Sequence, residues 1–187
     1  MPVTLEKIED KTANVAVLGL GYVGLPVACL LAEAGFAVTG IRRSQDKVEL
    51  INRGICPIQG REPGLAELLS RTVATGRLRA TTDQDVCRQA DVVLVAVETP
   101  VDPVSKKPGY EALRGALVAL SARLRPGTMV IIESTIAPGT MQSFVCPLLE
   151  DGSGLRSGRD LYLVYCPERV MPGRLLANIH DCHRVVG

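Results

Sequence analysis

The sequence has no tryptophan, and aromatic residues make up only 3% of its 187 residues. Proteins that bind single-stranded nucleic acid stack bases on aromatic side chains, and such side chains are scarce here. Charge of one sign is not in excess either, because 21 basic residues stand against 20 acidic residues. This balance gives no support for a nucleic-acid partner, whose phosphates attract clustered lysine and arginine.

Long hydrophobic runs are also missing. The apolar run 25–31 is too short to span a bilayer. The acidic residues Glu6, Glu9 and Asp10 do not suit a secretory signal peptide. We therefore expect a cytoplasmic protein with no membrane partner.

The six cysteines are scattered singly, and none forms a C-x-x-C pair. This spacing argues against a disulfide framework or a zinc site, and we expect most of them to be small core residues. His180 and His183 flank Cys182, but two histidines and a cysteine do not define a metal site without geometry. We expect no metal.

Short apolar runs alternate with segments of helical length. We predict strands at residues 14–18, 36–41, 78–81, 91–97, 129–133 and 161–165. We predict helices at residues 25–34, 45–53, 65–75, 110–124 and 140–149, with Ser44 as the cap of the second. Residues 1–11 indicate a polar arm, and residues 151–159 a mobile loop rich in glycine and serine.

This alternation is typical of an α/β fold: a Rossmann-like, doubly wound, mostly parallel sheet with helices on both faces. The length suits one domain, residues 12–187, after the arm 1–11. Such sheets bind ligands beyond the carboxyl ends of their strands. The segments that directly follow strands are therefore the candidate site: residues 19–24, 42–44, 98–103, 134–139 and 166–173.

The turn Gly19-Leu20-Gly21-Tyr22-Val23-Gly24 lies between the first predicted strand and helix. In a dinucleotide site the first glycine permits the tight turn, the second lets the backbone approach the pyrophosphate, and the third allows close packing of helix and strand. The helix N-terminus offers its free N–H groups to the phosphates. We expect this turn to bind a nicotinamide dinucleotide; the alternative is a glycine-rich turn without a ligand. The cofactor-binding residues predicted here are Gly19, Gly21, Tyr22, Val23 and Gly24.

An NAD site usually has an acidic residue at the end of the second strand, about 20 residues further on. That place holds Ile41-Arg42-Arg43-Ser44 and no acid. Two cations and a hydroxyl suit the 2′-phosphate of NADP better. The alternative is that Arg42 stacks on the adenine or is merely solvated. We therefore expect the cofactor to be NAD or NADP.

Several blocks occur in a fixed order between residues 14 and 187: GLGYVGLP, INRG, EPGL, ETP, IIESTIAPGT and YCPERVMPG. Together they resemble the UDP-glucose/GDP-mannose dehydrogenase family, and the last block is most similar to its N-acetylhexosamine branch, the UDP-N-acetylmannosamine dehydrogenases. The resemblance implies oxidation of the C6 hydroxyl of a nucleotide sugar to a carboxylate, with two cofactor molecules used in sequence, in polysaccharide biosynthesis. It also implies a cysteine that captures the aldehyde as a thioester. That cysteine, a lysine and an asparagine lie C-terminal to the region seen here.

Family members have a central helical segment and a second nucleotide-binding domain, which this sequence does not contain. The family forms dimers mainly through those central helices. We therefore expect a chain that is inactive alone and that works with the remaining domains, as a homodimer, on a nucleotide sugar.

The resemblance implies roles for residues in two blocks. Thr135 matches a threonine that binds the catalytic water near the nicotinamide, with Ser134 beside it; a helix cap is the alternative. Thr99 and Pro100 match a contact with the cofactor, although Glu98 replaces the usual proline before them. A carboxylate near phosphates is unfavourable unless it points away or meets a cation.

Glu168 and Arg169 match the substrate-facing block, where they would position the substrate or the water. Many UDP-glucose enzymes have a second glutamate four positions later that acts as a base, but this chain has Pro172 there. A surface ion pair or a solvated loop is the alternative for Glu168 and Arg169. Cys166 precedes this block and is expected to have no covalent role.

Two further classes of function compete with this assignment. One is another Rossmann oxidoreductase, of the 6-phosphogluconate or 3-hydroxyacid dehydrogenase type, although the ESTIAPGT and PERVMPG blocks argue against it. The other is a non-enzymatic module that binds a dinucleotide.

Overall fold

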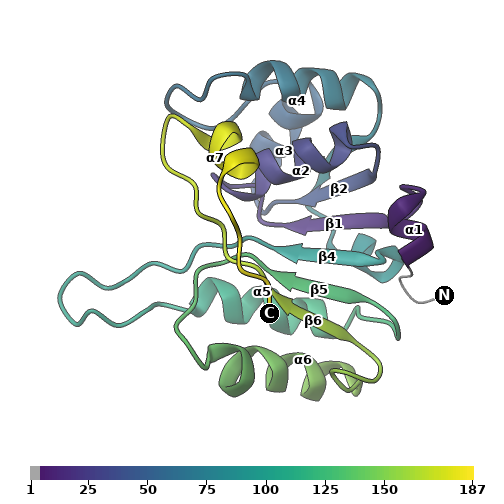
Figure 1. Cartoon of the computed structure of the whole chain (residues 1–187), viewed down its shortest axis with the longest axis vertical. Coiled ribbons are helices and arrows are strands. Elements are labelled where there is room, and N and C mark those ends of the chain that lie inside the picture. The colour runs from purple at the N-terminus through teal and green to yellow at the C-terminus, as the bar shows by residue number, and fades with distance from the viewer. Residues whose placement is uncertain (1–4) are drawn as a thin grey trace.

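The computed structural model describes residues 5–187 and contains a six-stranded sheet. Its strand order is β3-β2-β1-β4-β5-β6, and every neighbouring pair is parallel, as Figure 1 shows. The predicted doubly wound parallel sheet is therefore confirmed. The six strands are β1 (Asn14–Leu18), β2 (Ala37–Ile41), β3 (Leu78–Thr81), β4 (Val92–Val95), β5 (Met129–Ile132) and β6 (Tyr162–Tyr165).

Alternate residues of the central strands pack into two separate cores, because successive side chains of a strand point to opposite faces. Val15 and Val17 of β1 lie in one core, whereas Ala16 and Leu18 lie in the other. The first core is covered by α2 (Gly24–Glu33), α3 (Gln45–Asn52), α4 (Leu65–Ala74) and α7 (Leu175–Asp181). The second is covered by α5 (Glu111–Ser121) and α6 (Cys146–Ser153).

Part of the polar arm expected at residues 1–11 is helical. Residues 1–4 lie outside the described residues, but Leu5–Glu9 form helix α1. Lys7 Nζ lies 2.8 Å from Asp91 Oδ1, and Asp91 is only 1% exposed. Arg125 Nη2 at 2.7 Å and the N–H of Asn14 at 2.9 Å complete the hydrogen bonds of this carboxylate. The buried acid therefore holds α1 against the amino end of the sheet.

Other boundaries differ in ways that have local causes. The helix expected at residues 140–149 begins as a π-helix, Met141–Val145, and continues as α6 to Ser153. Gly154 then ends it in the left-handed conformation at φ 71°, so the loop expected at residues 151–159 starts three residues later. The short 3₁₀ helix Gln84–Gln89 and helix α7 were not predicted.

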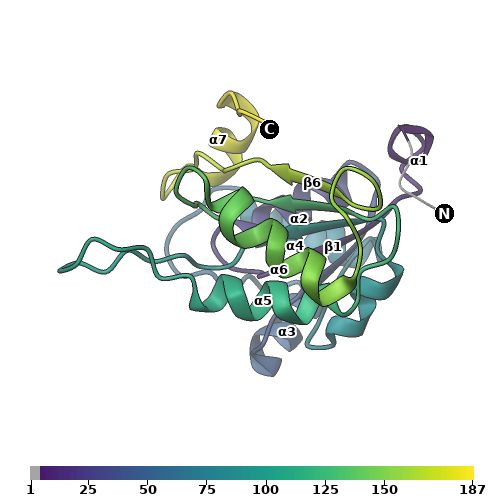
Figure 2. The ribbon, with the colours of Figure 1, turned by 90° about the horizontal axis from the view of Figure 1, so that it is seen from below.

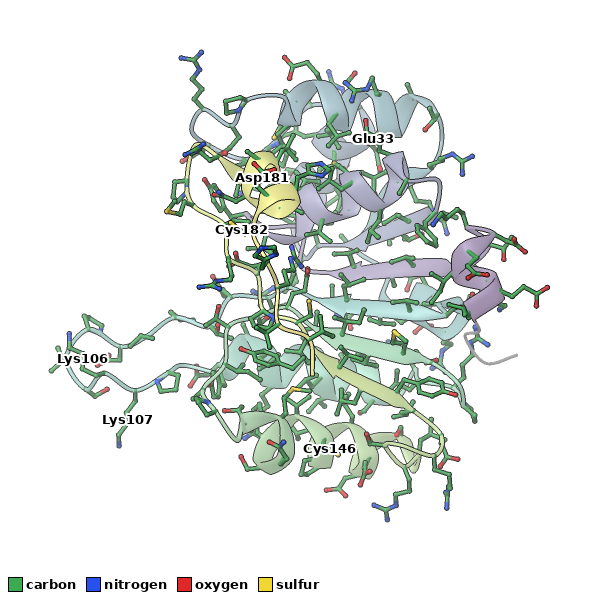
Figure 3. All side chains as sticks on the ribbon, viewed as in Figure 1. Glu33, Lys106, Lys107, Cys146, Asp181 and Cys182 are labelled. Atoms are coloured by element: carbon green, nitrogen blue, oxygen red, sulfur yellow. The ribbon has the colours of Figure 1, made fainter. Side chains whose placement is uncertain are left out.

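The segment between β4 and α5 leaves the body of the molecule as a long loop, which both Figure 1 and Figure 2 show. Its two arms meet in an antiparallel bridge between Val101 and Pro108. Lys106 and Lys107 lie near its tip, with their side chains directed away from the sheet (Figure 3). Among residues 5–187 we find no helix with the length and apolar character needed to cross a bilayer.

Candidate functional site: the carboxyl edge of the sheet

The turn after β1 contains three glycines, and the surroundings of each one differ. Gly19 has φ +98°, and a Cβ there would lie 2.5 Å from the carbonyl oxygen of Ala96. A Cβ at Gly24 would lie 2.0 Å from the carbonyl oxygen of Gly19, so helix α2 could not pack this closely with any other residue. At Gly21 a Cβ would meet nothing within 4 Å. The fold therefore requires Gly19 and Gly24, whereas Gly21 leaves space for something outside the chain.

A cavity of about 570 Å³ opens beside this turn. Its walls come from the carboxyl ends of three neighbouring strands and from α5, where a doubly wound sheet is expected to bind its ligand. Its polar and charged lining residues are Arg42, Arg43, Ser44, Gln84, Glu98 and Glu111. Two cations and two carboxylates therefore share the cavity with the glycine-rich turn.

Arg42 folds back toward the turn instead of extending into solvent. The side-chain Nη1 of Arg42 donates to the carbonyl oxygen of Leu20, and the backbone N–H of Arg42 donates to the carbonyl oxygen of Thr81 at 3.0 Å. Burial lowers the pKa of this guanidinium, which nevertheless remains a cation because its ordinary value is so high. Arg43 is exposed beside it, and Ser44 occupies the N-cap position of α3 without a side-chain capping bond. The predicted cap position is thus correct, but the hydroxyl does not cap.

The loops after β4 and β5 are tied together by hydroxyl groups. Thr99 Oγ1 donates to Thr135 O at 2.7 Å, and Ser134 Oγ donates to Val97 O at 2.7 Å. Ser134 is buried, whereas the side chain of Thr135 is exposed at the sheet edge. The next helix has Thr140 as its N-cap, so the alternative of Thr135 as a helix cap is wrong. Cofactor contacts of Thr99, Pro100 and Ser134 remain predictions.

Glu168 and Arg169 lie in the loop that follows β6. Glu168 Oε2 accepts a hydrogen bond from Val170 N and is half-buried, whereas Arg169 is exposed. In the described part of the chain neither forms an ion pair, so the alternative of a surface ion pair is not observed. Their roles toward a substrate remain predictions.

A buried acid beside this loop was missed by the sequence analysis. Glu133 at the end of β5 is 2% exposed, and its Oε1 lies 2.6 Å from Arg184 Nη1. Burial raises the pKa of Glu133, and the paired guanidinium opposes that shift. The same guanidinium nitrogen lies 3.9 Å from Cys166 Sγ. The ion pair between Glu133 and Arg184 fastens the C-terminal segment to the β5–β6 edge of the sheet. In the sequence, the only signal for Glu133 was an acidic residue directly after an apolar strand.

All six cysteines are free, and only Cys29 and Cys87 are buried, so the expectation that most are core residues was wrong. Burial raises the pKa of Cys29 to about 12 and that of Cys87 to about 11, which leaves both thiols protonated. Cys146 and Cys182 lie on well-separated parts of the molecule (Figure 3). Within residues 5–187 no group of three His, Cys, Asp or Glu side chains is placed to hold a metal ion.

Comparisons with known proteins agree with this geometry. Residues 13–187 match the family model described as "UDP-glucose/GDP-mannose dehydrogenase family, NAD binding domain". The UDP-N-acetyl-D-mannosamine dehydrogenase of Pyrococcus horikoshii is 36% identical over 174 residues, which are 93% of this chain and 40% of that protein. The GDP-mannose 6-dehydrogenase of Pseudomonas putida is 39% identical over 83% of this chain and 36% of its own length.

A solved structure gives the same result. The crystal structure of NDP-N-acetyl-D-galactosaminuronic acid dehydrogenase from Methanosarcina mazei Go1 superposes with a TM-score of 0.90 at 40% identity, over 100% of this chain and 41% of that one. The chain thus spans about two fifths of the length of its relatives. These matches decide against the 6-phosphogluconate and 3-hydroxyacid dehydrogenase alternatives. The chain belongs to the UDP-glucose/GDP-mannose dehydrogenase family, and the part of the family that it matches is the NAD-binding domain.

Proposed function

We propose that this domain holds NAD across the carboxyl edge of its sheet for the oxidation of a nucleotide sugar at its C6 hydroxyl, giving a uronate. The proposed substrate is UDP-N-acetylmannosamine. Two observations support that choice: the YCPERVMPG block resembles this branch, and the P. horikoshii relative carries this name.

The open approach to Gly21 is the observation that carries the proposal. Nothing inside the fold requires glycine there, but a dinucleotide site does, because its pyrophosphate must come close to the backbone. The adjoining cavity of about 570 Å³ has the size of a typical ligand site. The bound nicotinamide would supply the hydride acceptor; the chain's own residues would hold and orient it.

Three groups of residues have proposed roles around that cofactor. The backbone of Gly21, Tyr22 and Val23 would contact the pyrophosphate. Thr135 is exposed in the loop after β5, where its hydroxyl can hold a water by both donating and accepting. Glu168 and Arg169 would position the substrate or that water. The remaining domains of the enzyme and a homodimeric full-length form belong to the proposal, and a cytoplasmic location remains a prediction.

We also propose that the domain accepts NADP at least as well as NAD. The supporting observation is that Arg42 is held at the rim of the cavity by its bond to Leu20 O, with Arg43 exposed next to it. One guanidinium N–H is used by that bond, and an arginine has five. The remaining donors can serve a 2′-phosphate, whereas the acid usual in NAD sites would repel it.

Substituting Arg42→Asp tests this proposal by calorimetric titration of NAD and NADP at one salt concentration. A hydrogen bond to a charged group contributes about 1.5–3 kcal/mol, which is about tenfold to hundredfold in affinity. Solvent at the cavity mouth screens the pair, so we expect NADP binding to weaken by about tenfold. Arg53→Asp, at an exposed position outside the cavity, makes the same charge change as a control. Strong preference of the wild type for NAD that Arg42→Asp leaves unchanged would refute the proposal.

A further inference from the structure

Glu62 joins two parts of the chain that lie far from it in sequence. Its Oε1 accepts hydrogen bonds from the hydroxyl of Tyr22, in the glycine-rich turn, and from the N–H of Gly173 at 2.7 Å. Its Oε2 accepts the N–H of Leu175 at 3.2 Å. Tyr22 lies 40 residues before Glu62, and Gly173 lies 111 residues after it. One carboxylate therefore bridges the predicted cofactor turn and the end of the loop that carries Glu168 and Arg169.

Apolar packing brings these segments together, and the carboxylate fixes their register. Leu175 is 1% exposed and belongs to the same core as α2, and Tyr22 packs against that core. A Cβ at Gly64, two residues after Glu62, would lie 3.5 Å from Leu176 Cδ1, so the loop before α4 lies close to α7. Figure 1 shows α7 beside α2. Apolar contacts have no direction, whereas three hydrogen bonds to one carboxylate set the position of the loop end.

The protonation states suit this arrangement. Burial acts to raise the pKa of Glu62, but the hydrogen bonds from Tyr22, Gly173 and Leu175 outweigh it and lower the pKa, so the group is a carboxylate at neutral pH. Burial and then Glu62 raise the pKa of Tyr22, so the phenol keeps the proton that it donates. Donors and acceptor are therefore matched.

We propose that Glu62 is a positioning residue that couples the glycine-rich turn to the loop 168–173. A dinucleotide held by the turn would fix Tyr22, and Tyr22 would fix the loop end through Glu62. Placement of Glu168 and Arg169 would then depend on whether the cofactor is bound, and the dependence must be reciprocal. The inference rests on the proposed function, because it takes the dinucleotide to bind at this turn.

Amide hydrogen exchange of the 187-residue chain, with and without NAD, tests the coupling. In the wild type we expect NAD to slow exchange both in residues 19–25 and in residues 170–175. Glu62→Ala removes the acceptor of the Gly173 and Leu175 N–H groups, so exchange in residues 170–175 should become about tenfold to hundredfold faster. NAD should still slow residues 19–25 in that variant but no longer slow residues 170–175.

Tyr22→Phe keeps the ring and removes only the bridging hydroxyl. In this variant the Gly173 and Leu175 amides should stay protected by Glu62, but their response to NAD should disappear. Glu67→Ala, at an exposed position on α4, should behave as the wild type. A response of residues 170–175 to NAD that survives both Glu62→Ala and Tyr22→Phe would overturn the coupling. Absence of any NAD effect on residues 19–25 of the wild type would instead overturn the proposed function.

Discussion

Gly21 and Gly24 lie three positions apart in one turn, but replacing each with alanine should affect a different property. Gly24→Ala should lower the stability of the domain, whereas Gly21→Ala should lower its affinity for NAD. At Gly24 the new Cβ would lie 2.0 Å from the carbonyl oxygen of Gly19 and 3.1 Å from Ala96 Cβ. Backbone atoms cannot move aside as a flexible side chain can, so helix α2 must shift away from the sheet. At Gly21 the new Cβ meets nothing within 4 Å, and no left-handed φ forbids it.

These distances fix the expected magnitudes. Overpacking a well-packed site typically costs about 1–3 kcal/mol, and a backbone clash of this kind places Gly24→Ala at the upper end. For a chain of this length that corresponds to a loss of about 10 °C in Tm. Gly21→Ala should leave stability unchanged or raise it by up to about 1 kcal/mol, because alanine restricts the unfolded chain. The same methyl group would stand between the backbone and the pyrophosphate, and losing one charge-assisted hydrogen bond weakens NAD binding about tenfold to hundredfold.

Thermal unfolding and calorimetric titration of NAD, measured on both variants, separate these effects. We expect Gly21→Ala to be as stable as the wild type but defective in binding, with Gly21→Val unable to bind at all, and Gly24→Ala to be unstable. If Gly21→Ala were as destabilised as Gly24→Ala, the argument from open space at Gly21 would be wrong. If a folded Gly21→Val bound NAD with unchanged affinity, the pyrophosphate would not lie at this turn.

Two further predictions concern other parts of the chain. Burial acts to raise the pKa of Asp91, but the hydrogen bonds from Lys7, Asn14 N and Arg125 outweigh it, so the pKa is lowered on folding. Its contribution to stability is therefore present above the unfolded value of about 3.9 and is lost as the pH falls through the lower folded value. Asp91→Asn should lower the free energy of unfolding by about 3 kcal/mol at neutral pH, and the stability of the variant should depend less on acid pH than that of the wild type. Urea titrations that find the variant as stable as the wild type would contradict this. The purified 187-residue chain should bind NAD without converting UDP-N-acetylmannosamine. The resemblance places the thioester-forming cysteine outside these residues, and losing a covalent-catalysis group typically costs orders of magnitude in rate. Steady NADH formation above a sugar-free control would contradict this prediction.

Strand positions followed closely from the sequence, because a parallel strand buried on both faces is a short run of apolar residues. The prediction for β3 matches at both ends, and β1 matches as well. Elements with weak signals were missed. Helix α7 has seven residues and no capping side chain, and α1 has five residues, none of them buried. Their positions depend on tertiary contacts, such as the packing of Leu175 and the ion pair between Lys7 and Asp91.

The glycine-rich turn, its place after β1 and the missing acid at Arg42 are local properties, so the sequence alone determined them. The motif already predicts a role for each glycine, but only the fold decided the distances: a Cβ at Gly24 would lie 2.0 Å from Gly19 O, whereas a Cβ at Gly21 would meet nothing within 4 Å. The bridges from Glu62 to Gly173 and from Glu133 to Arg184 span 111 and 51 residues. No periodicity encodes such pairs, because they form only when the packing of the whole chain brings the loop before α4 against α7 and the C-terminal segment against the end of β5.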